Sequence, residues 1–159
     1  MTGQGCRPAR RVRHWPAAIG NGLAAGLCGT AAMTVSSTVE MKVRERPPST
    51  VPARAAGKVL GVKPTGEAEQ KRFATFVDWS YGAGWGMMRG VLGAAGFQGP
   101  AAAALFFADV WGAELVTLPL LDIGVPPVWR WGTVETVIDA FHHAVYATTT
   151  SVVYELLDS

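Results

Sequence analysis

Charged side chains are almost absent from four long stretches of this 159-residue chain, and this feature most restricts its fold. The first stretch, from Pro16 to Val39, has 24 residues and no charged side chain. A helix that crosses a bilayer needs about 20 mostly apolar residues. The stretches therefore predict four transmembrane helices, at about 16–40, 73–97, 101–121 and 133–157.

The composition and the placement of charge agree with this interpretation. The chain is 49% hydrophobic and 16% charged, whereas a typical soluble domain is about 25% charged. Its basic residues gather in a tail, residues 1–15, which we expect to be disordered, and in a polar loop, 42–72. The net charge of +2 is small and the basic residues lack interleaved aromatics, so we expect no nucleic-acid partner. Residues 16–159 then form a single membrane domain.

The polar loop contains one further predicted helix. Pro52 suits the first turn of a short helix over residues 53–61. Arg54 and Lys58 lie on a face next to an apolar one, which is typical of a helix at the membrane surface. Short turns join the other helices. The predicted fold class is therefore all-α, an antiparallel bundle of four transmembrane helices with a short interfacial helix in the first loop.

A cleaved signal peptide is the alternative interpretation of the first stretch, because basic residues precede it. However, the apolar run is longer than the usual signal core of about 7–15 residues. Leu27 also stands directly before Cys28, which does not suit a lipoprotein cleavage site. The sequence therefore favours a retained helix.

Glycines recur every fourth residue in two of the predicted helices. Gly82, Gly86 and Gly90 follow this spacing in the second helix, and Gly22 and Gly26 follow it in the first. Such spacing places the glycines on one face, where they let two helix backbones approach closely in lipid. We therefore predict that these five residues are helix-packing positions.

Ionisable side chains interrupt three of the four helices. A charge at the centre of a bilayer costs at least ~2.5–3.5 kcal/mol, so such groups face the protein interior and find partners there. We therefore predict an intramembrane polar cluster, near the end of the bundle that carries the polar loop. Its candidates are Asp78, Arg89, Asp109, Glu114, Glu135, Asp139, His142 and His143.

The last helix carries most of these groups in one pattern. Four polar side chains have the spacing i, i+4, i+7 and i+11 and form a single predicted stripe: Glu135, Asp139, His142 and Tyr146. His143 is turned by about 100° from this stripe and is expected to face another neighbour or the headgroups. The expected partners of the stripe are Asp78, Glu114 and Arg130.

Three roles for the cluster stay open. The first and favoured role is structural, with interhelical hydrogen bonds that fix the helices against one another. The second is passage of protons, ions or a small solute past Asp109, Asp139 and His142. The third is a single-metal site made by Glu135, Asp139 and His142 together with Glu114. A two-metal site lacks its second histidine motif. No nucleophile motif is present, so we expect no catalytic residue and no cofactor.

Three segments carry a resemblance to known proteins: "RPPSTVPARAAGKVLG", "WSYGAGWGMMRGVL" and "PVWRWGTVETVIDAFHHAVYATTTSVVYELL". They resemble small bacterial four-helix membrane proteins of unknown function and, more distantly, the YagU-like inner-membrane family. The resemblance covers about residues 16–157. It implies a multi-pass protein of the bacterial inner membrane and brings no established activity.

The orientation in the membrane stays open. The side with the tail has four Lys and Arg residues and the side with the polar loop has nine, which favours a cytoplasmic loop. The compact group from Arg7 to Arg13, next to the first helix, favours the opposite. The expected surroundings are the lipid bilayer, and a protein partner would be a second copy of the chain or another membrane protein.

Overall fold

The computed structural model describes residues 14–159, and every regular element within them is helical. This confirms the predicted all-α class for these residues. The predicted tail falls outside them, apart from its last two positions. The elements are α1 (Trp15–Val43), α2 (Val51–Leu60), α3 (Glu67–Ala94), α4 (Gly99–Leu120), the short 3₁₀ turn η1 (Val128–Arg130) and α5 (Thr133–Leu157).

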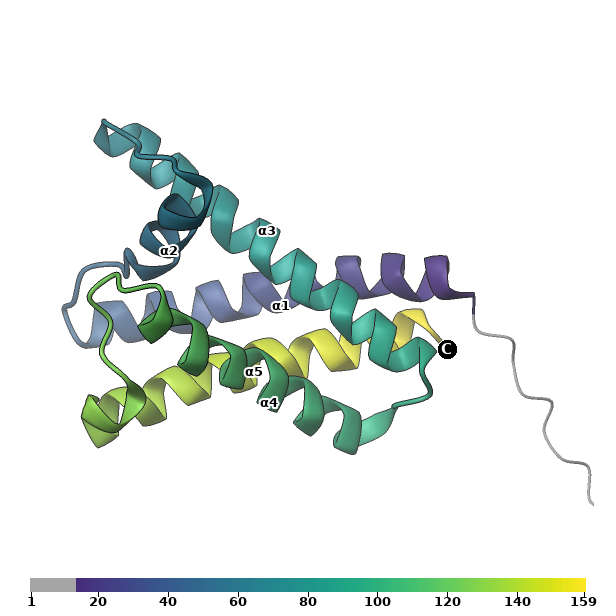
Figure 1. Ribbon diagram of the computed structural model, residues 1–159. Coiled ribbons are helices and arrows are strands. Elements are labelled where there is room, and N and C mark those ends of the chain that lie inside the picture. The colour runs from purple at the N-terminus through teal and green to yellow at the C-terminus, as the bar shows by residue number, and fades with distance from the viewer. Residues whose placement is uncertain (1–13) are drawn as a thin grey trace, which may run out of the picture.

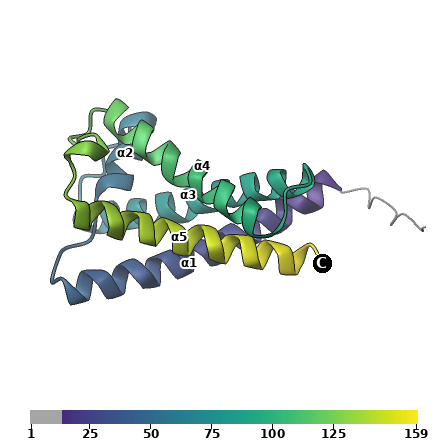
Figure 2. The ribbon, with the colours of Figure 1, turned by 90° about the horizontal axis from the view of Figure 1, so that it is seen from below.

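The first long helix, α1, lies at the centre of the molecule. It packs along its length against α3 and α5, and α4 packs mainly against α5 (Figures 1 and 2). Neighbouring long helices run antiparallel, so residues 44–66 and 121–132 lie at one end, here called the loop end (Figure 1). The turn between α3 and α4 and the C-terminus lie at the opposite end.

Glycines make the contact between α1 and α3, at a place here called the glycine seam: Gly22 and Gly26 of α1 with Gly82, Gly86 and Gly90 of α3. A Cβ atom added to Gly86 would lie 2.3 Å from the backbone oxygen of Gly22. One added to Gly26 would lie 2.5 Å from the oxygen of Gly82. Real Cβ atoms do not approach backbone so closely, so only glycine allows the two helices to cross at this distance.

The polar segment 42–72 is more helical than the sequence suggested. α2 has Pro52 in its first turn and ends at Gly61, whose φ of 67° is a left-handed conformation that glycine adopts without strain. α3 begins at Glu67, six residues before the predicted start at Phe73. Glu67 and Glu69 lie in its first turn, where their negative charges interact favourably with the positive end of the helix dipole and stabilise the helix.

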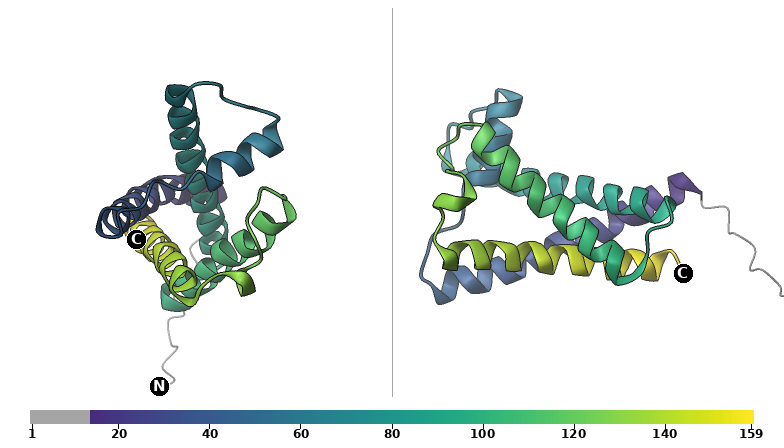
Figure 3. Two further views of the ribbon diagram at one scale, coloured as in Figure 1. Left: turned by 90° about the vertical axis from the view of Figure 1, so that its left-hand side faces the viewer. Right: turned by 60° about the horizontal axis from the view of Figure 1, so that its bottom comes forward.

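The first half of α3 leaves the other long helices, and α2 lies beside it (Figures 1 and 3). Two basic side chains of α2 reach across to the connection that follows α4. The Arg54 Nη1 donates to the backbone oxygen of Ile123 at 2.9 Å, and the Lys58 Nζ donates to that of Asp122 at 3.1 Å. These bonds tie the two connections of the loop end together.

The distribution of side chains is the reverse of that in a water-soluble domain. Between residues 14 and 159, only nine apolar residues are buried, whereas 24 large apolar side chains are exposed. The buried positions include many small or polar residues, among them Thr30, Arg89, His142, His143, Thr150 and Ser151. A compact apolar cluster of Phe106, Val110, Tyr146 and Ala147 joins α4 to α5.

Candidate functional site

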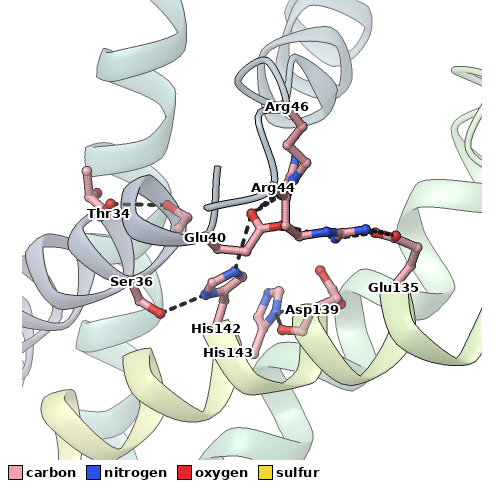
Figure 4. Close-up of polar contacts among 10 residues, drawn as sticks. Thr34, Ser36, Glu40, Arg44, Arg46, Glu135, Asp139, His142 and His143 are labelled. Atoms are coloured by element: carbon pink, nitrogen blue, oxygen red, sulfur yellow. Dashed lines mark hydrogen bonds and ion pairs between the residues drawn. The ribbon is translucent and has the colours of Figure 1, made fainter. Parts of the chain in front are cut away.

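The polar side chains of α5 contact three different helices at three levels. Near the loop end they face α1 and α4, and near the opposite end they face α3. Figure 4 shows the contacts near the loop end, where His142 and His143 stand side by side on α5. The contacts at each level decide what the site is able to do.

The outermost contacts join the end of α1 to the start of α5. The Glu40 carboxylate accepts hydrogen bonds from Arg44 at 3.0 Å and from the Arg46 Nε at 2.8 Å. Arg44 also forms a two-pronged ion pair with Glu135, which is exposed (Figure 4). The neighbouring Glu135 and Glu40 carboxylates raise the pKa of the Arg44 guanidinium above its ordinary value. These pairs lie in contact with solvent, so each contributes little to stability.

His142 lies one level deeper, between α5 and α1. Its Nδ1 shares a hydrogen bond of 2.8 Å with the Ser36 hydroxyl, and its Nε2 lies 4.0 Å from the Glu40 carboxylate (Figure 4). The side chain is 8% exposed, yet Nε2 has no hydrogen-bond partner among the described residues. His142 also lines a cavity of about 180 Å³ together with Arg46, Trp131, Glu135, Ile138 and Asp139.

His143 turns to the other side of α5, towards α4. Its Nε2 lies 2.5 Å from the Glu114 carboxylate, and its Nδ1 lies 2.9 Å from the backbone oxygen of Asp139. The Asp139 carboxylate accepts a hydrogen bond of 2.8 Å from the indole N–H of Trp111. One ligand atom each from Glu114, Asp139 and His143 lies within 4.8 Å of the other two. These three residues are here called the α4–α5 triad.

The deepest level holds Arg89 of α3, which is completely buried. Its Nε donates to the Ser151 hydroxyl at 3.1 Å, and an Nη2 hydrogen bond of 3.0 Å reaches Glu155. Its guanidinium carbon lies 4.6 Å from the centre of the Tyr154 ring, as in a cation–π contact. Glu155 also accepts a bond of 2.7 Å from the backbone N–H of Gly99. This group holds α3, α4 and α5 together at the end opposite the loops.

The structure differs from the predicted stripe of α5 and its expected partners. Glu135 and His142 turn towards α1, whereas Asp139 turns towards Trp111 of α4. His143, expected to stand apart, is as buried as His142 and joins Asp139. The physical reason is that α5 lies between two helices, so side chains 100° apart on its surface each meet a different neighbour.

Two of the predicted cluster residues stay outside these groups. Asp78 is exposed and Asp109 is half-buried, and the described residues give neither of them a hydrogen bond or ion pair. Of the partners expected for the stripe, Glu114 pairs with His143 instead, and Asp78 and Arg130 are not among the contacts of Glu135, Asp139 or His142.

The sequence analysis did not name several of the actual partners: Ser36, Arg44, Arg46, Trp111, Ser151 and Glu155. One of them had a visible signal, because Glu40 and Arg44 have the i, i+4 spacing of a helical ion pair. Ser36 and Trp111 lie on other helices, Arg46 follows α1, and Ser151 and Glu155 lie on α5 itself. The spacing of these residues in the sequence does not show which distant residue each one contacts.

Comparison of the chain with protein-family models, with curated proteins and with solved structures found no match. The resemblance to the YagU-like family therefore stays a prediction.

Proposed function

We propose that this chain is an integral membrane protein whose four long helices, α1, α3, α4 and α5, all cross the bilayer. The observation that carries the proposal is the reversed distribution of side chains, with large apolar groups outside and glycine, hydroxyl and ionisable groups inside. Soluble proteins bury their large apolar groups, whereas a surface of this kind is stable when lipid surrounds it.

Two helices meet the length and hydropathy expected of a membrane span by themselves. They are α1 and α4, and their most apolar windows are only 33% and 22% buried. A core helix of a soluble protein would bury most of such a window. At 1.5 Å per residue the two helices are about 44 and 33 Å long, and the hydrocarbon core of a bilayer is about 30 Å thick.

The other two spans follow from packing. α3 and α5 are less apolar because they carry residues such as Arg89, His142 and His143, but these three residues are buried. A helix whose polar groups face its neighbours presents an apolar surface to lipid. α1 also supplies the main packing surface for both helices. Removal of α1 as a signal peptide would expose the glycine seam and the Ser36–His142 contact, which favours a retained helix.

The proposed role of the polar groups is to fix the bundle. Ser36 and Glu40 of α1 contact His142 of α5. Trp111 and Glu114 of α4 contact Asp139 and His143, and Arg89 of α3 contacts Ser151. Hydrogen bonds between helices in lipid contribute about 0.6 kcal/mol each on average. Their main effect is on specificity, because each helix then has one position along α5 at which its polar groups are satisfied. The stated resemblance favours the inner membrane of a bacterium.

The single cysteine of the described residues offers a direct test. Cys28 lies near the middle of α1 and is exposed in the isolated chain. In a Cys6→Ser variant, we expect a water-soluble maleimide to leave Cys28 unlabelled from either side of the membrane until detergent denatures the protein. A Cys6→Ser, Cys28→Ser, Ser49→Cys variant is the matched control, since Ser49 is exposed in the connection before α2. It should be labelled from one side only.

Two outcomes would contradict the proposal. One is release of the protein into the soluble fraction by alkaline carbonate. The other is labelling of Cys28 in the native membrane as fast as labelling of the cysteine at position 49.

A further inference from the structure

We propose that the α4–α5 triad, Glu114, Asp139 and His143, binds a divalent first-row transition-metal ion. The sequence suggested a different set, with Glu135 and His142, but Glu135 faces Arg44 and His142 faces Ser36. The triad brings three ligand atoms of suitable type within 4.8 Å of one another on two adjacent helices. The inference does not depend on the membrane proposal, because the same contacts would bind a metal in any surroundings.

The hydrogen bonds of His143 show which ring nitrogen is free to bind a metal. Nδ1 lies 2.9 Å from the backbone oxygen of Asp139. A carbonyl oxygen only accepts, so Nδ1 carries a hydrogen. In the neutral ring the lone pair is then on Nε2, which points at the Glu114 carboxylate at 2.5 Å. Two acceptors at that distance need a positive species between them, which is either a proton or a metal ion.

The charge of the surroundings favours the metal ion over the proton. The two carboxylates of the triad are half-buried, and within residues 14–159 their ion pairs are to His143 and not to any Lys or Arg. With a proton on His143 the triad keeps a net charge of −1. With a divalent cation and a neutral imidazole the net charge is zero, and a neutral group costs less to bury than a charged one.

The residues around the triad resemble the usual supports of a metal site. Metal-binding histidines commonly donate their other N–H to a carbonyl or carboxylate, and binding carboxylates are themselves hydrogen-bonded. His143 donates to the Asp139 carbonyl, and the Trp111 indole donates to the Asp139 carboxylate at 2.8 Å. Ligands at about 2.0–2.2 Å from a tetrahedral ion lie roughly 3.3 Å apart, so Nε2 of His143 and the Glu114 carboxylate would separate by less than ~1 Å.

A cavity borders the triad at Asp139. It has a volume of about 180 Å³, and its lining includes Asp139 and His142 but neither Glu114 nor His143. A site with three protein ligands keeps a position for water or a small ligand. The cavity offers space for such an occupant on the Asp139 side of the site.

The ligand types restrict the metal. One imidazole and two carboxylates suit Zn²⁺, Fe²⁺ or Mn²⁺, whereas Mg²⁺ and Ca²⁺ prefer oxygen ligands only. No thiol takes part, because Cys28, the free cysteine of the described residues, is exposed on α1.

The test measures metal content and affinity in the full-length protein, purified in mild detergent without a chelator. We expect about one equivalent of Zn²⁺, Fe²⁺ or Mn²⁺ per chain by elemental analysis. After removal of the metal, Co²⁺ should produce the visible absorption bands of a low-coordinate nitrogen and oxygen site. Glu114→Gln and His143→Gln should weaken Co²⁺ binding more than 100-fold. Trp111→Phe should weaken it about 10–100-fold, as expected for an outer hydrogen-bond donor.

Two variants serve as matched controls. His142→Gln removes the adjacent buried histidine, and Asp109→Asn removes another acid of α4. Both should keep one equivalent of metal. Unchanged elution in size-exclusion chromatography and unchanged helicity identify variants that remain folded.

Three outcomes would overturn the proposal. The first is a wild-type protein without stoichiometric metal and without a Co²⁺ spectrum, which would identify the triad as an ordinary ion pair. The second is full metal binding by a folded Glu114→Gln or His143→Gln protein. The third is loss of the metal in His142→Gln, which would assign the site to the other face of α5. None of these outcomes depends on how the protein behaves in carbonate or maleimide experiments.

Discussion

The glycine seam and the polar contacts of α5 hold the same bundle together in opposite ways. At the seam, α1 and α3 touch backbone to backbone, and no side chain stands between Gly22 and Gly86. Along α5, side chains of several kinds fill the space, and each contact joins two specific groups. The glycine seam forms because its residues have no side chains, whereas the contacts of α5 form because specific polar groups meet.

This difference determines how each contact responds to substitution. A backbone contact has no rotamer to change, so any added atom must push the helices apart. A side-chain contact loses one interaction while its neighbours keep the helices in place. We therefore expect the seam to be the less tolerant of the two, and four substitutions test this expectation.

The largest effect is expected at the centre of the seam. Gly86→Ala places a Cβ 2.3 Å from the Gly22 oxygen and 2.5 Å from the Gly26 Cα. Overpacking costs about 1–3 kcal/mol where side chains are able to adjust, so we expect a loss of at least about 3 kcal/mol here. Denaturation in mixed detergent micelles measures it.

Gly84→Ala is the control for this substitution. Gly84 lies in the same helix, and a Cβ there meets nothing within 4 Å. Its effect should be neutral or stabilising by up to about 1 kcal/mol, as for alanine in place of glycine in a helix. Equal losses at the two positions would show that the seam is not a close contact.

A smaller loss is expected from Arg89→Gln, about 2 kcal/mol in the same assay. Removal of one partner of a fully buried ion pair costs about 3–5 kcal/mol. The Glu155 side chain is 39% exposed, so its carboxylate stays partly solvated after Arg89 is removed. The loss of stability should therefore be smaller than for a fully buried pair. Arg72→Gln, at an exposed position of α3, is the control and should change the stability by less than about 0.5 kcal/mol. A loss at Arg89 as small as the control would mean that the buried contacts contribute nothing.

Tyr146→Phe should cost about 1 kcal/mol. The Tyr146 hydroxyl donates to the backbone oxygen of Gly82 at 2.6 Å, and phenylalanine keeps the packing of the ring against Phe106. The measured change in stability then reports mainly the loss of one neutral hydrogen bond. A change above about 2 kcal/mol would indicate that the hydroxyl also positions α3 against α5.

The smallest effect is expected from Arg44→Gln at the loop end. Its pairs with Glu40 and Glu135 are partly exposed and are screened by salt, so the loss of stability should be smaller than that of Tyr146→Phe. It should disappear in high salt. A loss of the same size at high salt would contradict a simple surface ion pair.

The seam was predictable from the sequence because its glycines recur at a regular spacing of four residues. Glycines at every fourth position occupy one face of any helix, whatever surrounds it. For the polar contacts, the sequence predicted that polar side chains of α5 would find partners on other helices, but it did not predict which partners. Helical spacing places Asp139 and His142 near one another, but it does not say where the neighbouring helices stand. The i, i+4 spacing also brings Asp139 close to His143 on the same helix. The rotation of α5 between α1 and α4 decides which residues of other helices these side chains meet, and only the packed bundle determines that rotation.

The start of α3 was missed for a related reason. The residues from Glu67 to Arg72 are polar, and the sequence analysis equated polar with loop. A helix that extends beyond its packing partners has no need of an apolar face, and acids in its first turn favour it. The number of transmembrane spans stays a prediction for α3 and α5, whose interior charges lower the hydropathy that identifies a span.

The central place of α1 has a consequence for how the protein is made. α1 is synthesised before α3, α4 and α5, yet one of its two main neighbours is α5. The hydrogen-bond partner of Ser36, His142, is synthesised 106 residues later, and that of Arg89, Ser151, is synthesised 62 residues later. The early helices must therefore persist with unsatisfied polar groups until synthesis of α5 is complete. An insertion factor that shelters those groups, or a pause before α5, would change the yield of folded protein more than its final stability.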